Sequence, residues 1–124
     1  MTITALLTGR GNSSLKNKNI LPVLGKPILW YPCSEAKKCN SINHYFVSSD
    51  DNKILNLAAK LGFAKIKRPK RLSKKNSLHK DVLLHSLNFL KKNKINTKIL
   101  VVLLANSVST KADWIENCIS KLKR

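Results

Sequence analysis

Ile99-Leu100-Val101-Val102-Leu103-Leu104 is the stretch of sequence that decides the fold. It contains no polar residue, and Ala105 extends the apolar run without bringing it to the length of a membrane span. A short continuous run of branched apolar residues is typical of a β-strand covered on both faces, as in a parallel sheet. Parallel strands need crossover connections, which are usually helices. The segment therefore predicts an α/β fold.

The rest of the chain alternates between strand and helix patterns. Strands are predicted near residues 3–8, 44–49, 63–66 and 98–104. The segments between them predict helices: from Ile28 or Pro32 to Lys38, from Asp50 to Gly62, from Ser77 to Lys92, and from Thr110 onward. Asp50 is expected to cap the second helix and Gly62 to end it. This alternation predicts a mostly parallel sheet with helices on both faces.

Apolar residues at helical spacing predict the face that each helix turns toward the sheet. These residues are Ile54, Leu57, Ala58 and Leu61 in the second helix, Leu83, Leu87 and Leu90 in the third, and Ile115, Cys118, Ile119 and Leu122 in the last. Ligands of such folds bind outside the carboxyl ends of the strands. Three segments are therefore expected on one rim: Gly9–Asn19, Ser48–Asp51 and Ala105–Ser109.

Length and charge bound the possible functions. The chain has 124 residues, which is the size of one domain, here taken as 1–124. It has 24 Lys and Arg against 6 Asp and Glu, a net charge of +18 that attracts anions. The basic residues are mostly Lys, and the cluster Lys65–Lys75 has no aromatic residue, which speaks against specific nucleic-acid binding. A basic nucleic-acid-associated module nevertheless stays open as an alternative function.

Cysteine spacing and the N-terminal sequence add two expectations. Cys33, Cys39 and Cys118 lack the spacing of a metal site and predict reduced thiols. The segment Met1–Leu7 has neither a basic leader nor a cleavage site, so the default expectation is a cytoplasmic protein without a membrane partner.

The loop after the first predicted strand reads Thr8-Gly9-Arg10-Gly11-Asn12-Ser13-Ser14-Leu15-Lys16-Asn17-Lys18-Asn19-Ile20. Its glycines allow the backbone to approach a ligand closely, and exposed amides can face phosphate oxygens. It lacks the Gly-Lys-Ser/Thr of a Walker P-loop, and Ser14 occupies the place of the third glycine of a dinucleotide fingerprint. On physical grounds alone, a phosphate-binding loop and a plain basic turn both remain open.

Six blocks of the sequence resemble the acylneuraminate (CMP-N-acetylneuraminic acid synthetase-like) cytidylyltransferase family, N-terminal half. They are Leu6–Ser13 followed by Lys18–Ile20, Leu24–Ile28, Val47–Asp51, Arg68-Pro69 with Leu72, Asp81–Leu87, and Leu103-Leu104. The blocks keep the order and approximate spacing of the family pattern. The resemblance implies a three-layer αβα Rossmann-like sandwich of the nucleotide-diphospho-sugar transferase type. It also implies transfer of CMP from CTP to a sugar acid, with release of pyrophosphate.

The resemblance also implies roles for individual residues. Arg10 and Lys18 would hold the CTP triphosphate as catalytic residues. Asn19 and Arg68 would contact the cytidine part of the nucleotide. The remaining nucleotide-binding residues implied are Gly9, Gly11, Asn12 and Ser13. Catalysis of this kind depends mainly on positioning and on neutralising negative charge, to which Arg, Lys and a divalent metal contribute.

The chain also departs from the family pattern. The family continues into a sugar-binding and dimerisation half that contains its metal-binding aspartates, so this chain is interpreted as a short or truncated member. Mg²⁺ is expected from the family, with ligands that cannot be identified here, and Asp50 and Asp51 are better explained as helix caps. A homo-oligomer is possible. The isolated chain is expected to bind CTP weakly and to form CMP-sugar slowly or not at all, and a catalytically incomplete nucleotide-binding remnant is a further alternative.

Overall fold

A computed structural model describes residues 2–9, 20–72, 79–107 and 109–123. Four parallel strands form its main sheet: β1 (Ile3–Thr8), β4 (His44–Ser49), β5 (Ala64–Lys67) and β6 (Ile99–Leu104), in the order β5-β4-β1-β6. β1 lies in the centre, and all six of its residues are buried. The predicted α/β architecture and all four strands are confirmed, with β5 displaced by one residue from its predicted position.

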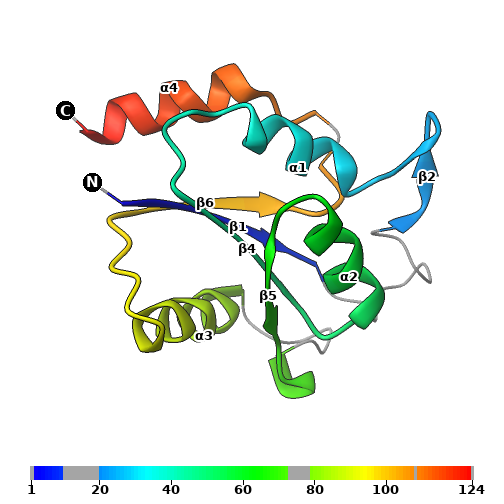
Figure 1. The fold of residues 1–124 in the computed structure, drawn as a ribbon, viewed down its shortest axis with the longest axis horizontal. Helices are drawn as coiled ribbons and strands as arrows, with labels where there is room; N and C mark the ends of the chain where they lie inside the picture. Colours follow the sequence, from blue (N-terminus) through cyan, green and yellow to red (C-terminus); the bar gives the residue numbers. More distant parts are fainter. Residues whose placement is uncertain (1, 10–19, 73–78, 108, 124) are drawn as a thin grey trace.

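Helices cover both faces of this sheet (Figure 1). α1 (Trp30–Lys37), α2 (Asn52–Lys60) and α4 (Ala112–Lys123) contribute to one buried cluster that also contains Ile3, Ala5 and Leu7 of β1. α3 (His79–Lys92) lies on the opposite side, where the Phe89 ring is 6.2 Å from the Phe46 ring of β4. Because successive residues of a strand point to opposite faces, β1 supplies both sides of the core.

A short hairpin precedes α1. β2 (Pro22–Val23) and β3 (Lys26–Pro27) pair antiparallel across Leu24 and Gly25, whose φ angles are 50° and 84°. Two successive positive φ angles are typical of the tight turns that connect hairpin strands, and glycine adopts such a φ without strain. The hydroxyl of Tyr31 in α1 donates a hydrogen bond to the Val23 carbonyl and so holds the hairpin against the helix.

The ends of α2 show how local sequence sets helix boundaries. Asp51, and not the predicted Asp50, is the N-cap, and its carboxylate accepts a 2.8 Å hydrogen bond from the Lys53 N–H. At the other end Gly62 has a φ of 93°, and the N–H groups of Gly62 and Phe63 bond to the carbonyls of Ala59 and Ala58. These bonds form a Schellman motif, so the predicted stop at Gly62 is confirmed.

The beginning of α4 depends on a distant residue. The helix expected from Thr110 begins at Ala112, whose N–H donates a hydrogen bond to Glu35 of α1, and the Thr110 hydroxyl pairs with that of Ser107. The hydrogen bond from Lys38, and after it the one from Ala112, keeps the pKa of the Glu35 carboxyl below its usual value. A carboxylate at a helix N-terminus also interacts favourably with the helix dipole. Glu35 therefore joins α1 to α4.

Three predicted burial patterns, those of β6, α4 and α3, are wrong in part. β6 was expected to be covered on both faces, but it lies at an edge of the sheet and exposes Val102 and Leu104. In α4 only Ile115 and Ile119 face the core, whereas Cys118 and Leu122 are exposed. Leu87 of α3 is also exposed, because the inner stripe of that helix is Val82, Ser86 and Leu90. Apolar spacing identifies a face but does not identify what covers it.

Candidate nucleotide site

The carboxyl ends of the four parallel strands meet at one edge of the sheet. Backbone hydrogen bonds connect the residues there: Gly9 N–H to Ser48 O at 3.3 Å, Arg68 N–H to Ser49 O at 2.8 Å, and Ala105 N–H to Thr8 O at 3.0 Å. This is the edge at which α/β proteins bind their ligands. The described parts of the three segments predicted on one rim therefore lie together, and Arg68 lies beside them.

Arg68 is held by the strand next to it. Its side chain is buried, with 5% of its surface exposed. Nε lies 3.3 Å from Ser48 Oγ, and Nη2 donates a 3.0 Å hydrogen bond to the Ser48 carbonyl. The same carbonyl accepts the bond from Gly9 N–H, so the two predicted residues that the structure describes meet at one oxygen atom. The other predicted site residues, namely Arg10, Gly11, Asn12, Ser13, Lys18 and Asn19, lie outside the described residues.

Two polar residues of α3, His85 and Ser86, were not among the predicted site residues. Within the described part of the chain, His85 Nδ1 and Ser86 Oγ are buried and have no hydrogen-bond partner. Burial lowers the pKa of His85, and the positive charges of Arg71, Arg68 and Lys92 lower it further. The i, i+4, i+8 spacing of Val82, Ser86 and Leu90 could have identified Ser86 as an inward residue. The apolar spacing in the sequence instead predicted Leu83, Leu87 and Leu90 as the inward face of this helix.

One acidic residue at this edge, Asp51, has a structural role. Asp51 caps α2, and its own N–H bonds to Ser49 Oγ at 3.1 Å. The Asp50 carbonyl accepts a 2.7 Å hydrogen bond from Lys67 Nζ. Among residues 2–9, 20–72, 79–107 and 109–123, no three His, Cys, Asp or Glu side chains gather as metal ligands. The capping interpretation is therefore confirmed for Asp51, and the predicted Mg²⁺ stays a prediction without identified ligands.

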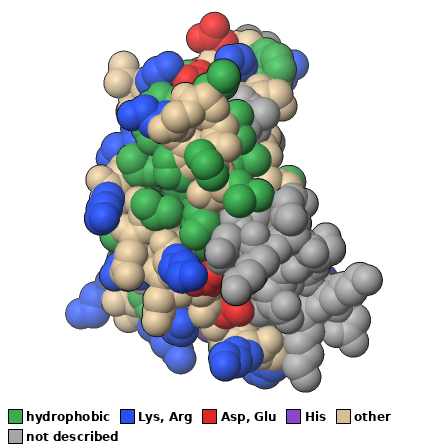
Figure 2. All heavy atoms as spheres, turned by 90° about the vertical axis from the view of Figure 1, so that its right-hand side faces the viewer, with side chains coloured by type: hydrophobic (Ala, Val, Ile, Leu, Met, Phe, Trp, Pro, Cys, Tyr) green, Lys and Arg blue, Asp and Glu red, His purple; other side chains and the backbone are tan. Residues whose placement is uncertain are grey.

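The surface around this edge is basic. Figure 2 looks onto the side at which β1 and β6 end, where Lys and Arg side chains are spread widely and acidic ones appear at few places. The net charge of +18 makes the surroundings attractive to a phosphate-bearing ligand. Helices long and apolar enough to cross a membrane are absent from the described parts of the chain.

The sign of the His85 shift leads to a testable pH dependence. A histidine whose pKa is lower in the folded state binds protons more readily when unfolded, so stability falls as pH decreases through the ordinary value of 6.5. We expect the free energy of unfolding in urea to drop between about pH 7.5 and about pH 5.5, and His85→Gln to reduce that drop. His79→Gln, at an exposed position of the same helix, is the control. If His85→Gln showed the same pH dependence of stability as the unchanged chain, His85 would not be the cause of the drop.

A comparison with protein families identifies the class of protein. The model of the family described as cytidylyltransferase matches residues 4–123, which is nearly the whole chain. The chain belongs to the cytidylyltransferase family. A curated relative from Helicobacter pylori (strain ATCC 700392 / 26695) is a pseudaminic acid cytidylyltransferase and UDP-2,4-diacetamido-2,4,6-trideoxy-beta-L-altropyranose hydrolase. It is 36% identical over 75 residues, which are 59% of this chain and 14% of the relative.

Solved structures share the fold of this cytidylyltransferase-family chain at low sequence identity. CMP:2-keto-3-deoxy-manno-octonic acid synthetase complexed with CTP superposes with a TM-score of 0.82 at 17% identity, over 99% of this chain and 48% of that chain. A cytidylyltransferase from Leptospira borgpetersenii serovar Hardjo-bovis (strain JB197) gives 0.75 at 19% identity, over 98% and 48%. 4-Diphosphocytidyl-2C-methyl-D-erythritol synthase gives 0.72 at 9% identity, over 98% and 54%. The chain thus spans about half the length of these structures.

Proposed function

We propose that this chain is the CTP-binding part of a nucleotidyltransferase that transfers CMP from CTP to a sugar acid and releases pyrophosphate. One observation carries the proposal: Gly9 and Arg68 meet at the Ser48 carbonyl on the ligand-binding edge of the sheet. They belong to two blocks that lie far apart in the sequence and that both match the pattern of acylneuraminate cytidylyltransferases. The family match over residues 4–123 supports the same nucleotide chemistry.

The proposed roles fall on basic and polar side chains. Arg10 and Lys18 neutralise the triphosphate, and the backbone of Gly9, Gly11, Asn12 and Ser13 contributes to the phosphate loop. Asn19 and Arg68 contact the cytidine part. Arg10 and Lys18 contribute positive charge to the neutralisation of the triphosphate, and Mg²⁺, expected from the family resemblance, would contribute to the same neutralisation. The acceptor is proposed only as a chemical class, a sugar acid. The names of two similar proteins, a pseudaminic acid cytidylyltransferase and a CMP:2-keto-3-deoxy-manno-octonic acid synthetase, contain sugar acids of this class.

Arg10→Ala tests the phosphate loop. Because a charge-assisted hydrogen bond contributes about 1.5–3 kcal/mol, we expect CTP binding measured by calorimetry to weaken by about 10- to 150-fold. The control is Lys60→Ala, which removes one positive charge at the far end of α2 and should leave CTP affinity nearly unchanged. Equal losses in the two variants would mean that CTP is attracted by overall charge and not by a site. Binding of a random oligonucleotide as tight as that of CTP would favour the nucleic-acid alternative.

Turnover tests the complete reaction. The chain is incubated with CTP, Mg²⁺ and N-acetylneuraminic acid while pyrophosphate release is followed. We expect CTP binding with slow or no formation of CMP-sugar, because turnover also needs an acceptor pocket and an oriented hydroxyl, and the chains of similar fold are about twice as long. Rapid turnover that Lys18→Ala abolishes would show that this chain is sufficient by itself. Absence of both CTP binding and turnover would contradict the proposed function.

A further inference from the structure

α3 passes over β4 in the opposite direction, and this places His85 at a definite level of the strand. α3 connects the end of β5 to the beginning of β6, which are parallel strands, so it runs from the carboxyl edge of the sheet back to the amino edge (Figure 1). The rings of Phe89 and Phe46 lie 6.2 Å apart. Four helix residues and two strand residues both advance the chain by about 6 Å. His85, four residues before Phe89, therefore lies at the level of Ser48.

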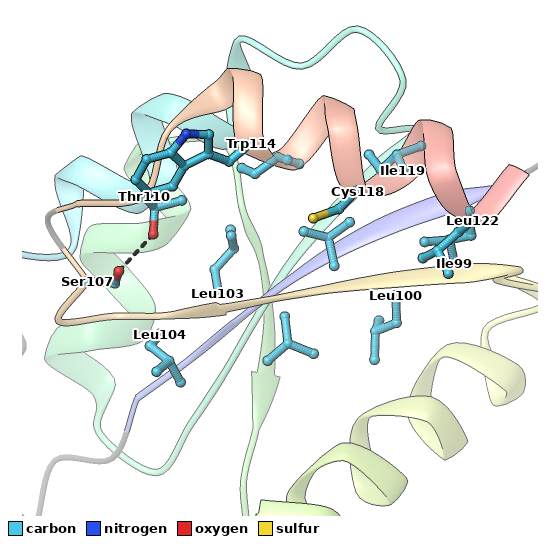
Figure 3. Close-up of a pocket in the computed structure, with 13 residues that line it drawn as sticks. Ile99, Leu100, Leu103, Leu104, Ser107, Thr110, Trp114, Cys118, Ile119 and Leu122 are labelled. Carbon is cyan, nitrogen blue, oxygen red and sulfur yellow. Dashed lines mark hydrogen bonds between the residues drawn. The ribbon is translucent and has the colours of Figure 1, made fainter.

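The side chain of Ser48 points to the face of the sheet that α3 covers. Thr8 is the register partner of both Ser48 and Leu104, and paired residues of neighbouring strands point to the same face. In the close-up of the pocket between β6 and α4, Leu104 points away from α4 and toward the side of α3 (Figure 3). Ser48 is buried, and its hydroxyl and carbonyl hold the Arg68 guanidinium. His85 thus lies on the same side of β4 as Arg68, at the candidate nucleotide site.

Charge controls the protonation state of His85 more than hydrogen bonding does. Its Nδ1 is buried and has no partner in the part of the chain that the structure describes. Burial lowers the pKa of His85, and so do the positive charges of Arg71 in η2 (Lys70–Leu72), of Arg68 and of Lys92. Asp81, one turn earlier, is the only acidic residue of α3. His85 is therefore kept neutral in the free chain by burial and by the same basic side chains that surround the candidate site.

A bound triphosphate changes this balance of charge. Its several negative charges offset the positive charges of Arg68 and Arg71 and attract a protonated imidazole. An opposite charge nearby favours the charged form of a histidine and raises its pKa. Because neutral His85 starts from a lowered pKa, the change is largest near the pH at which an ordinary histidine titrates.

We propose that CTP binding at this edge is coupled to the uptake of one proton by His85, so that the chain holds CTP more tightly as pH falls. The inference rests on the proposed CTP site and gives that site a pH-sensitive affinity. His85 acts through charge and is not assigned a contact with the nucleotide. The proton comes from solvent and returns to it when CTP leaves.

Binding linkage gives the direction of the effect. A group whose pKa rises on binding makes the complex tightest below the pKa of the free chain, and this extra affinity is lost as pH rises through the pKa of the complex. The pKa of His85 in the free chain lies below 6.5. The extra affinity should therefore develop as pH decreases from about 7.5 to about 5.5.

Calorimetry of CTP binding to the full chain at several pH values is the first test. We expect the ratio of the CTP Kd of His85→Gln to that of the unchanged chain to increase about three- to tenfold from pH 7.5 to pH 5.5, which corresponds to a pKa rise of about half a unit to one unit. A terminal phosphate itself titrates near pH 6, but its effect is common to both chains and cancels in the ratio. His44→Gln, at the amino end of β4, is the control and should behave like the unchanged chain. Circular dichroism checks that each chain is folded at each pH.

NMR measures the protonation of His85 directly. The chain has three histidines, and the imidazole signal that disappears in His85→Gln belongs to His85. CTP should move the midpoint of its pH titration upward by about half a unit to one unit, whereas cytidine, which has no phosphate, should not. The signal of His44 is the internal reference.

The outcomes separate this inference from the proposed function. If CTP bound with the same pH dependence to the unchanged chain and to His85→Gln, or left the His85 midpoint unchanged or lower, the coupling would be overturned while the CTP site would stand. A midpoint that cytidine moved as far as CTP does would overturn the role of phosphate charge. Absence of CTP binding at every pH would overturn the proposed function and this inference with it.

Discussion

Phe63→Ala is expected to remove about 3–5 kcal/mol from the free energy of unfolding, the usual loss for a large aromatic residue truncated in a core. Phe63 is 1% exposed, and its ring centroid lies 5.3 Å from that of Tyr45 in an edge-to-face arrangement. The backbone at Phe63 is fixed by the Schellman motif at the end of α2, so the site has little freedom to collapse around the missing ring. Since domains of this size are stable by about 5–15 kcal/mol, the variant should be close to unfolded under mild denaturing conditions.

Urea unfolding followed by circular dichroism measures this loss. Leu84→Ala is the control because Leu84 is 50% exposed on α3, and such surface changes alter stability by about 0.5 kcal/mol or less. If both variants lost the same small amount of stability, Phe63 would not pack as the structure shows.

Arg68→Ala is the second large effect, with an expected loss of about 2–4 kcal/mol of stability. Its guanidinium connects β5 to β4 through Ser48, and hydrogen bonds to a charged group contribute about 1.5–3 kcal/mol. Removing it also leaves the buried Ser48 hydroxyl without this partner. Arg68→Lys should recover only part of the loss, because an ammonium group cannot reproduce the planar fork of the guanidinium.

Arg68 also connects stability to the proposed site. If it contacts the cytidine part of CTP, Arg68→Lys should weaken CTP binding under conditions where the variant is still folded. Urea unfolding and CTP calorimetry on the same preparation separate the two effects. A fully folded Arg68→Lys variant with unchanged CTP affinity would limit Arg68 to a structural role. Stability unchanged in Arg68→Ala would contradict its position between β4 and β5.

Part of the candidate site was predicted from the sequence, and the arrangement of the strands explains why that part was found. Gly9 and Arg68 were selected from separate sequence blocks, and the parallel order of β1, β4 and β5 brings them together at Ser48. His85 and Ser86 were not selected, because a helix pattern in a sequence records apolar spacing and not the polar atoms that tertiary packing buries. The roles of Arg10 and Lys18 stay predictions, since both residues lie outside the described part of the chain.

The sequence by itself determined the four strands of the main sheet, the helices between them, the stop of α2 at Gly62, and the family resemblance of its blocks. These features depend on side-chain periodicity and on backbone preferences within a few residues, which a sequence records directly. Only the tertiary structure decided what lies against each element. Ile99–Leu104 is as apolar as a buried strand, yet β6 is an edge, and α4 turns Cys118 and Leu122 away from the core. The physical reason is that burial depends on which distant segments pack against a surface, and an apolar pattern marks a surface to be covered without specifying what covers it.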